Sequence, residues 1–191
     1  GAGKSTLSRL VVAACARIGL RACVVSLDDY YLPRLERLAL AGRVHPLFET
    51  RGPPGTHDVA LCREHLLALG EPGDVDMPVF DKGLDDRVGT RRRTGPFELV
   101  LLEGWCVGAM PASDTALASA CNRLEREEDA DGVWCGHANA ELARGYADLW
   151  RELESLVFLR VPDLDAVRRW RLEPEAERPA DRPPDAAAIA R

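Results

Sequence analysis

The chain has 191 residues, of which 46% are hydrophobic and 29% are charged, and its formal net charge is -6. A chain of this size can bury one full core, so a single domain is the simplest expectation. The net negative charge argues against general binding to nucleic acids or to acidic membranes, because both need a basic surface on the protein. We therefore expect the partner to be a small molecule.

No stretch reaches the roughly 18 consecutive apolar residues of a membrane span, and no signal sequence is visible. The six cysteines form no C-x-x-C pair. This usage favours reduced thiols in a cytoplasmic protein over a disulfide framework or a zinc site. Cys121, Cys135 and His137 could be drawn as metal ligands, but their spacing fits no common template. The sequence leaves the oligomeric state open.

The first six residues match the second half of the phosphate-binding loop G-x-x-x-x-G-K-[ST]. In that loop, backbone N–H groups surround a phosphate, the lysine reaches the outer phosphates and the hydroxyl ligates Mg²⁺. Apolar residues then recur at helical spacing over residues 7–18, so a helix opens at the loop. The residues that we expect at the phosphates of a nucleotide are Gly1, Ala2, Gly3, Lys4, Ser5 and Thr6.

Strands and helices are expected to alternate after this first helix. Residues 21–27 are typical of a buried strand, and residues 34–42 of a short helix. The Gly- and Pro-rich residues 44–57 favour a loop. Asp58 is suited to cap the next helix, and Gly70 is its natural stop.

The charged residues 82–93 follow, and we expect their arginine run, 91–93, to form a solvated loop face. Residues 97–102 are typical of a second buried strand, which ends at Glu103. A long amphipathic helix is expected over 131–153 and a third strand over 156–161.

Asp163 is expected to cap a last helix that reaches Arg171. Residues 174–191 are rich in Pro and Ala and predict a disordered tail, so the domain is expected over 1–173. Strands that alternate with helices imply an α/β fold. We expect a three-layer fold like that of the P-loop NTPases, with a mostly parallel, doubly wound sheet.

Two acidic positions at the strand ends could serve phosphoryl transfer. Ser5 would ligate Mg²⁺ directly, and Glu103 would hold it through water. A hydroxyl acceptor needs a carboxylate to take its proton, and Asp28 lies at the correct edge of the sheet. Asp29 is the alternative, because adjacent residues at a strand end point to opposite sides. Helix capping or turn formation would explain the aspartate pair equally simply, and Glu103 can be a mere strand-end charge.

Basic residues in the two loops expected near Asp28 indicate a small anionic acceptor, which such donors would bind through charge-assisted hydrogen bonds. Each of them is as readily a surface or loop-stabilising residue. Arginines on the last helix could close over the transferring phosphate as a lid or simply be solvated. The loop residues are His45, Arg51, His57, Lys82 and Arg87, and the helix residues are Arg168, Arg169 and Arg171.

Several strings together resemble one enzyme family. Residues 26–31, S-L-D-D-Y-Y, resemble the S-x-D-x-[FY]-Y signature of the uridine kinase, phosphoribulokinase and pantothenate kinase group of P-loop kinases. More narrowly, P-G-T-H-D at 54–58 and E-G-W-C-V-G at 103–108 resemble the plant-type D-glycerate 3-kinases and their bacterial and fungal relatives. The resemblance runs from Gly1 to about Glu173.

The resemblance implies phosphorylation of the 3-hydroxyl of D-glycerate, or of a similar small anionic alcohol, by ATP with Mg²⁺. It implies that Asp28 is the general base, that Lys4 acts on the phosphates and that Glu103 is the second acidic residue of the metal site. The residues expected at the acceptor are Tyr31, Arg51, His57, Lys82 and Arg87, and those expected at the nucleotide lid are Arg168 and Arg171.

The family pattern also includes a strand and the first motif glycine before Gly1, and further helices after Glu173. We therefore expect a chain that is truncated at both ends of the family domain. Two further hypotheses stay open: a protein that binds ATP without kinase turnover, and a kinase for another small hydroxyl acceptor. A nucleotide switch is disfavoured, because no guanine-reading N-K-x-D string occurs.

Overall fold

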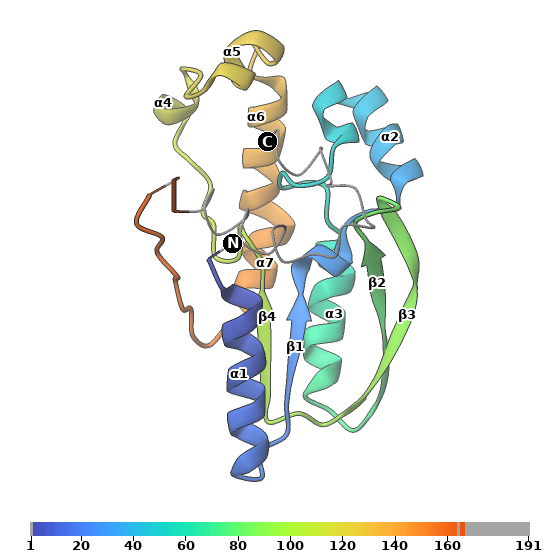
Figure 1. Ribbon diagram of the computed structural model, residues 1–191. Helices are drawn as coiled ribbons and strands as arrows, with labels where there is room; N and C mark the ends of the chain where they lie inside the picture. Colours follow the sequence, from blue (N-terminus) through green and yellow to red (C-terminus); the bar gives the residue numbers. More distant parts are fainter. Residues whose placement is uncertain (1, 164, 167–191) are drawn as a thin grey trace, which may run out of the picture.

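The computed structural model describes residues 2–163 and 165–166. At its centre, β1 (Ala22–Ser26) and β4 (Leu99–Glu103) pair in parallel, with Ala22 opposite Leu99 and Ser26 opposite Glu103 (Figure 1). Parallel strands need a crossover connection, and the helices between β1 and β4 provide it. The α/β class and the parallel pairing that the sequence predicted are therefore confirmed.

Helices flank this strand pair on two sides. α1 (Lys4–Arg17) contacts both β1 and β4. On the other side, Cys23 and Val25 of β1 share one core with Cys62 of α3 (Val59–Leu69) and Leu149 of α7 (Ala147–Trp150). The alternation of buried side chains along β1 thus assigns one face of the strand to this core.

The connection from β1 to α3 is built from short helices. η1 (Leu27–Tyr30) is a 3-10 helix that directly follows β1, and it is followed by α2 (Arg34–Arg43) and the 3-10 helix η2 (Pro46–Glu49). Asp58 caps α3 as predicted, because its Oδ1 accepts the N–H of Leu61 at 3.1 Å. Gly70 is the C-cap residue of the same helix, also as predicted.

The charged segment that we expected as a loop is half of an antiparallel hairpin. β2 (Gly73–Asp81) pairs with β3 (Asp86–Gly95), so the prediction of a loop over the arginine run was wrong. Apolar alternation is weak in β3 because most of its side chains are exposed. Ion pairs between the two strands contribute to the hairpin instead of apolar contacts. Arg92, for example, donates to both carboxylate oxygens of Asp76 at 2.8 Å.

Beyond β4, the chain forms α4 (Asp114–Leu117), α5 (Arg123–Glu128) and α6 (Val133–Glu141). A π-helical segment, Leu142–Tyr146, joins α6 to α7. The long helix predicted over 131–153 therefore exists, but it is shorter at both ends and contains a π-bulge. No helix within the described residues has the length and apolar character that crossing a bilayer requires.

Residues 156–161 do not form the predicted third strand. Leu156, Val157 and Phe158 are exposed, and no described strand pairs with this segment. An apolar run becomes a strand only when another strand takes up its backbone hydrogen bonds, which the pattern alone cannot supply.

Asp163 Oδ1 accepts the N–H of Ala166 at 2.6 Å, as expected of a capping residue. The rest of the predicted last helix, with Arg168, Arg169 and Arg171, lies outside the described residues. The same is true of Gly1 and of the predicted tail over 174–191. All six cysteines are free thiols, as the sequence analysis expected.

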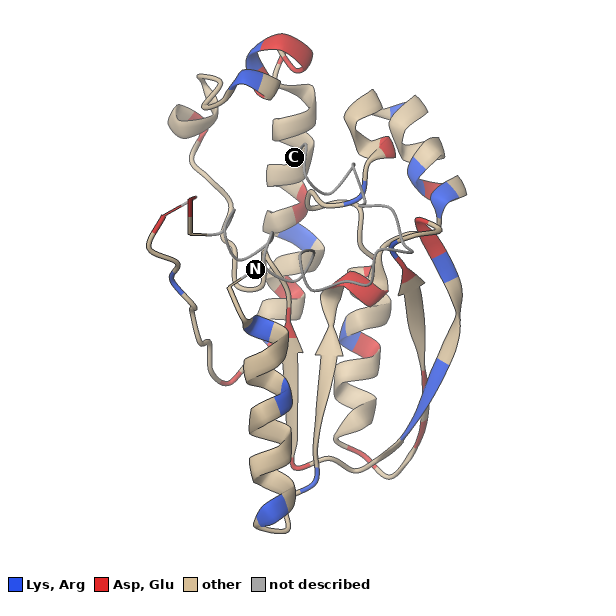
Figure 2. Cartoon of the chain, in the orientation of Figure 1, with Lys and Arg blue, Asp and Glu red and all other residues tan. Residues whose placement is uncertain are grey.

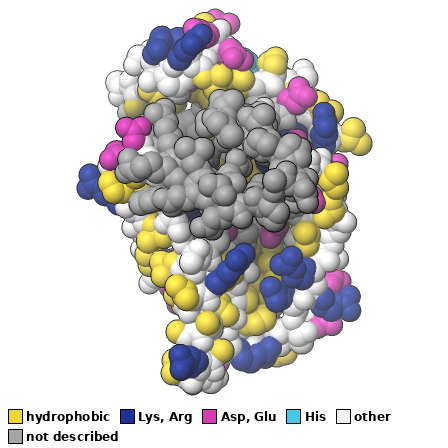
Figure 3. Space-filling model, in the orientation of Figure 1, with side chains coloured by type: hydrophobic (Ala, Val, Ile, Leu, Met, Phe, Trp, Pro, Cys, Tyr) yellow, Lys and Arg dark blue, Asp and Glu magenta, His cyan; other side chains and the backbone are white. Residues whose placement is uncertain are grey.

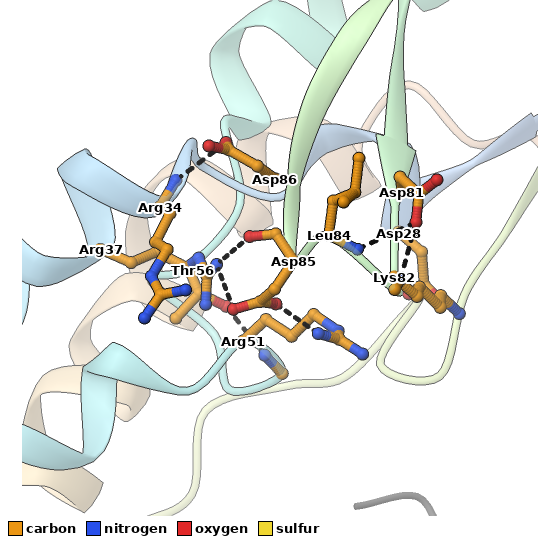
Figure 4. A network of polar contacts seen from close by, with 12 residues as sticks. Asp28, Arg34, Arg37, Arg51, Thr56, Asp81, Lys82, Leu84, Asp85 and Asp86 are labelled. Atoms are coloured by element: carbon orange, nitrogen blue, oxygen red, sulfur yellow. Dashed lines mark hydrogen bonds and ion pairs between the residues drawn. The ribbon is translucent and has the colours of Figure 1, made fainter. Parts of the chain in front are cut away.

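The buried Arg37 guanidinium connects α2 to the tip of the hairpin (Figure 4). It donates to the carbonyl oxygens of Leu32 at 3.2 Å, Glu49 at 2.7 Å and Asp85 at 2.6 Å. It also donates to Asp85 Oδ2 at 2.8 Å. One fully buried charge is thereby satisfied from three segments of the chain, which fixes the hairpin tip against the connection that follows β1.

We predict that Arg37→Met lowers the free energy of unfolding by about 3 kcal/mol, because it leaves part-buried carbonyl groups without their donor and the Asp85 carboxylate with Arg51 as its remaining partner. Urea denaturation measures this loss. Arg92→Met is the matched control, since it removes an exposed ion pair of the same hairpin and should cause no measurable loss. Equal losses in the two variants would contradict the structural role of Arg37.

Candidate functional site

A cavity of about 640 Å³ runs along β1 between α1 and the hairpin, and it includes the carboxyl ends of β1 and β4. Acidic residues gather at these strand ends, and basic residues follow β3 (Figure 2). Basic side chains also gather on the lower half of the face seen in Figure 3. The polar residues that line the cavity are Lys4, Ser5, Arg9, Ser26, Asp28, Asp29, Lys82, Arg91, Arg93 and Glu103.

The phosphate-loop residues open α1 at one end of the cavity. Gly3 has φ 80°, a left-handed conformation that favours glycine, and its carbonyl accepts the N–H of Leu7 at 2.9 Å. The helix therefore starts at Lys4, and Lys4 and Ser5 line the cavity. Thr6 lies exposed in the first turn of the helix and Ala2 precedes Gly3.

The Ser5 hydroxyl meets the acidic end of β4. Ser5 Oγ donates to Glu103 Oε1 at 3.2 Å, and Ser26 Oγ donates to the same oxygen at 3.0 Å. Ser26 lies opposite Glu103 in the strand register, so the parallel pairing itself brings these groups together. Hydroxyl and carboxylate oxygens are the ligands that Mg²⁺ prefers. The pair of Ser5 and Glu103 therefore fits the predicted metal site.

Asp28 and Asp29 lie on η1 rather than at the end of a strand, and both line the cavity. Asp29 Oδ1 accepts the N–H of Phe80 at 3.2 Å. Burial raises the pKa of Asp29, and the Phe80 N–H opposes that rise. Asp28 Oδ2 instead accepts a hydrogen bond from Lys82 Nζ at 2.6 Å (Figure 4). The two aspartates thus differ in their partners: a backbone N–H donates to Asp29, and an exposed ammonium group donates to Asp28.

Two of the arginines expected at the acceptor support the walls of the site. Arg87 donates to the carbonyl oxygens of Tyr31 at 2.8 Å and Tyr30 at 3.2 Å, and so holds the segment that carries Asp28. Arg51 pairs with Asp85, and its guanidinium carbon lies 5.8 Å from the centroid of the Phe80 ring. Neither arginine is among the described residues that line the cavity.

The rings of Tyr31 and His57 stack beside this segment, with centroids 4.3 Å apart. His57 is 5% exposed, and its Nδ1 lies 2.6 Å from the hydroxyl oxygen of Tyr146. Burial lowers the pKa of His57 to about 4, although the charge of Asp28 opposes this effect. His45 lies elsewhere: its Nδ1 accepts the N–H of Leu47 at 3.3 Å.

The sequence analysis missed several residues of the site. Arg91 and Arg93 line the cavity because alternate residues of β3 lie on one face of the strand. This could be predicted only if the segment had been assigned to a strand. Trp105 also lines the cavity, and its Nε1 donates to the carbonyl of Gly52 at 3.0 Å. Tyr146 carries no local signal, because only the fold brings it to His57.

No family model matches the chain. It is 33% identical over 189 residues to "Uncharacterized kinase mug58" of Schizosaccharomyces pombe, covering 92% of this chain and 66% of that protein. It is 28% identical over 190 residues to the chloroplastic D-glycerate 3-kinase of Arabidopsis thaliana, covering 92% of this chain and 39% of that protein. The structure of D-glycerate 3-kinase from Cryptococcus neoformans var. grubii superposes with a TM-score of 0.73 at 29% identity, covering 91% of this chain and 66% of that one.

These three proteins are all longer than the chain, which spans between 39% and 66% of their lengths. The two comparisons that cover about two thirds of the relative extend over more than nine tenths of this chain.

We predict that the buried neutral imidazole of His57 makes stability depend on pH. Between the folded pKa of about 4 and the ordinary value of 6.5, the unfolded chain binds a proton that the folded chain does not. The free energy of unfolding therefore rises with pH across this window. His57→Gln should reduce that rise by about 3 kcal/mol, which denaturation at the two ends of the window measures. An unchanged rise would mean that other groups cause it.

Proposed function

This chain belongs to the P-loop kinases related to D-glycerate 3-kinase, and we propose that it transfers the terminal phosphoryl group of ATP to the 3-hydroxyl of D-glycerate. One observation carries the proposal. A single cavity is lined by Lys4, Ser5 and Glu103 on one side and by Asp28 and Lys82 on the other. Phosphoryl transfer requires both halves: cations and a metal for the phosphates, and a base for the attacking hydroxyl.

On the phosphate side, the backbone at the start of α1 and the Lys4 ammonium bind and orient the phosphates of ATP. Ser5 and Glu103 would hold Mg²⁺, which supplies charge neutralisation of the phosphate oxygens when it is bound. Their oxygens already lie 3.2 Å apart, so they can share one cation without a large rearrangement of either element. The roles of Arg168 and Arg171 at a nucleotide lid remain predictions.

On the acceptor side, Asp28 takes the proton of the substrate hydroxyl as the oxygen attacks phosphorus. Lys82 Nζ pairs with Asp28 Oδ2 at 2.6 Å. Its side chain is 60% exposed, so it can turn to the carboxylate of an anionic acceptor, and this exchange would release Asp28 for the hydroxyl.

A second candidate is a kinase for another anionic hydroxyl compound that is larger than glycerate. Arg91 and Arg93 favour it, because they line the same cavity at a distance along β1 from the phosphate loop. A three-carbon acid bound between Asp28 and Lys82 would leave these two arginines without a ligand. A longer acceptor with a second acidic group would engage them through charge-assisted hydrogen bonds.

A coupled assay of ADP formation tests the two candidates. D-glycerate should give turnover with ATP and Mg²⁺, and L-glycerate should give much less. Turnover with a longer hydroxy acid or a phosphorylated alcohol, and none with D-glycerate, would favour the second candidate. Nucleotide-dependent thermal stabilisation without turnover on any acceptor would overturn both candidates and leave a protein that only binds ATP.

We predict that Asp28→Asn lowers kcat by about 10²- to 10⁴-fold, the usual contribution of a general base. ATP affinity should stay within about threefold of the parent value, because Asp28 faces the acceptor half of the cavity. Asp29→Asn is the matched control, since the Asp29 carboxylate is engaged by the Phe80 N–H. A larger loss of kcat in Asp29→Asn than in Asp28→Asn would assign the base to Asp29 instead.

A further inference from the structure

Tyr146 is a fully buried residue at the end of the π-helical segment. A π-helical turn takes in one more residue than an α-helical turn, and such bulges occur frequently at functional sites. Here the backbone departs from helical geometry at Arg144, with φ −110° and ψ −108°. After this bulge, the Tyr146 ring lies edge-on to His57, with centroids 5.9 Å apart, and its hydroxyl reaches the loop that carries Gly55 and His57.

The hydrogen bonds of this hydroxyl define the tautomer of His57. Gly55 N–H donates to the hydroxyl oxygen at 3.0 Å, and His57 Nδ1 lies 2.6 Å from it. The backbone N–H of His57 also interacts with the hydroxyl oxygen. Of these groups, His57 Nδ1 is the one that can accept a hydrogen bond from the hydroxyl. Its own proton therefore has one acceptor, Nδ1, which must be unprotonated. The imidazole proton is then on Nε2.

The opposite tautomer leaves more groups unsatisfied. With a proton on Nδ1, the Tyr146 hydroxyl oxygen would accept from Nδ1 as well as from backbone N–H groups, and the hydroxyl proton would have no acceptor among the described residues. Nε2 would also be a buried acceptor without a donor. In the Nε2–H tautomer, Nε2–H is the single one of these groups that lacks a hydrogen-bond partner. Each buried polar group without a partner costs about 1–3 kcal/mol of folding stability.

That single group is itself informative. His57 Nε2 is buried and has no hydrogen-bond partner within the part of the chain that the structure describes. It belongs to a ring that stacks on Tyr31, three residues after Asp28, and Tyr31 and His57 form a backbone bridge. A preorganised donor that has no partner among the described residues and lies beside the acceptor half of the site is suited to an oxygen that a ligand brings.

We propose that Tyr146 is a positioning residue that holds His57 as the Nε2–H tautomer, so that His57 donates a hydrogen bond to an oxygen of the acceptor substrate. The proposal rests on the proposed function for the identity of that substrate as an anionic alcohol. Gly52 and Gly55, with φ 136° and 99°, lie in the loop before His57. The proposal requires this loop to shift when the acceptor binds, because Nε2 is buried and His57 is not among the residues that line the cavity.

Tyr146→Phe removes the hydroxyl and keeps the ring. We expect it to raise KM for D-glycerate about tenfold, the loss of roughly one hydrogen bond, with a smaller effect on kcat. Tyr30→Phe is the matched control, because Tyr30 is also fully buried and its hydroxyl lies 3.1 Å from Nδ1 of another histidine, His65. That variant should leave KM unchanged. A KM in Tyr146→Phe equal to that of Tyr30→Phe would overturn the proposal.

Nitrogen-15 NMR of labelled histidine tests the tautomer without any turnover. In the parent chain, His57 should show an unprotonated Nδ1 and a protonated Nε2, and Tyr146→Phe should give a mixture of tautomers. Added D-glycerate should shift the Nε2 signal in the parent chain. A protonated Nδ1 in the parent would overturn the proposal even if the kinase is active.

The same spectra separate the two proposals. If D-glycerate is not turned over but a longer anionic alcohol is, the shift of the Nε2 signal is measured with that alcohol. An Nε2 signal that no turned-over acceptor moves, or that moves equally in Tyr146→Phe, would mean that a buried water satisfies His57, and the positioning role would be wrong.

Discussion

The parallel pairing of β1 with β4 is the constraint on which the site depends. It places Ser26 opposite Glu103, and their side chains share a hydrogen bond of 3.0 Å. Since both strands end at the same edge of the sheet, η1 with its aspartates and the start of α1 with Ser5 meet there. Backbone hydrogen bonds between two short strands thus decide the distance between groups that lie 98 residues apart in the chain. A shift of the strand register would separate the Ser5 hydroxyl from the Glu103 carboxylate.

A second set of interactions brings the hairpin to this edge. Arg37 is buried and binds the hairpin tip through Asp85, while Arg87 binds the backbone carbonyls that follow Asp28. These arginines act as cross-links, because each donates to at least two carbonyl oxygens of other segments of the chain. Lys82 lies two residues before Leu84 in the turn of the hairpin. Its side chain is exposed and pairs with Asp28. The different roles of the arginines and the lysine follow from their side-chain chemistry. The planar guanidinium can donate to several fixed acceptors at once, whereas the ammonium group at the end of a flexible side chain can exchange one partner for another.

Local signals predicted much of this arrangement. The helix that follows the phosphate-loop motif, both paired strands, and Asp58 and Gly70 at the ends of α3 depend on patterns within a few residues, and the structure bears them out. The hairpin was missed because its outer strand is mostly exposed and carries charges where strands usually alternate. Residues 156–158 are apolar enough for a strand, yet they remain exposed, because strand formation needs a partner and not only a pattern.

The sequence by itself determined the chemical classes present: a phosphate-binding loop, acidic residues at strand ends, and basic residues in the segments between them. Only the tertiary structure decided which of these basic residues face the cavity. Lys82, Arg91 and Arg93 line it, whereas Arg51 and Arg87 support its surroundings. The contact between Tyr146 and His57 likewise spans 89 residues. The physical reason is that residue type fixes what a side chain can bind, but burial and partners arise from contacts between segments far apart in the chain.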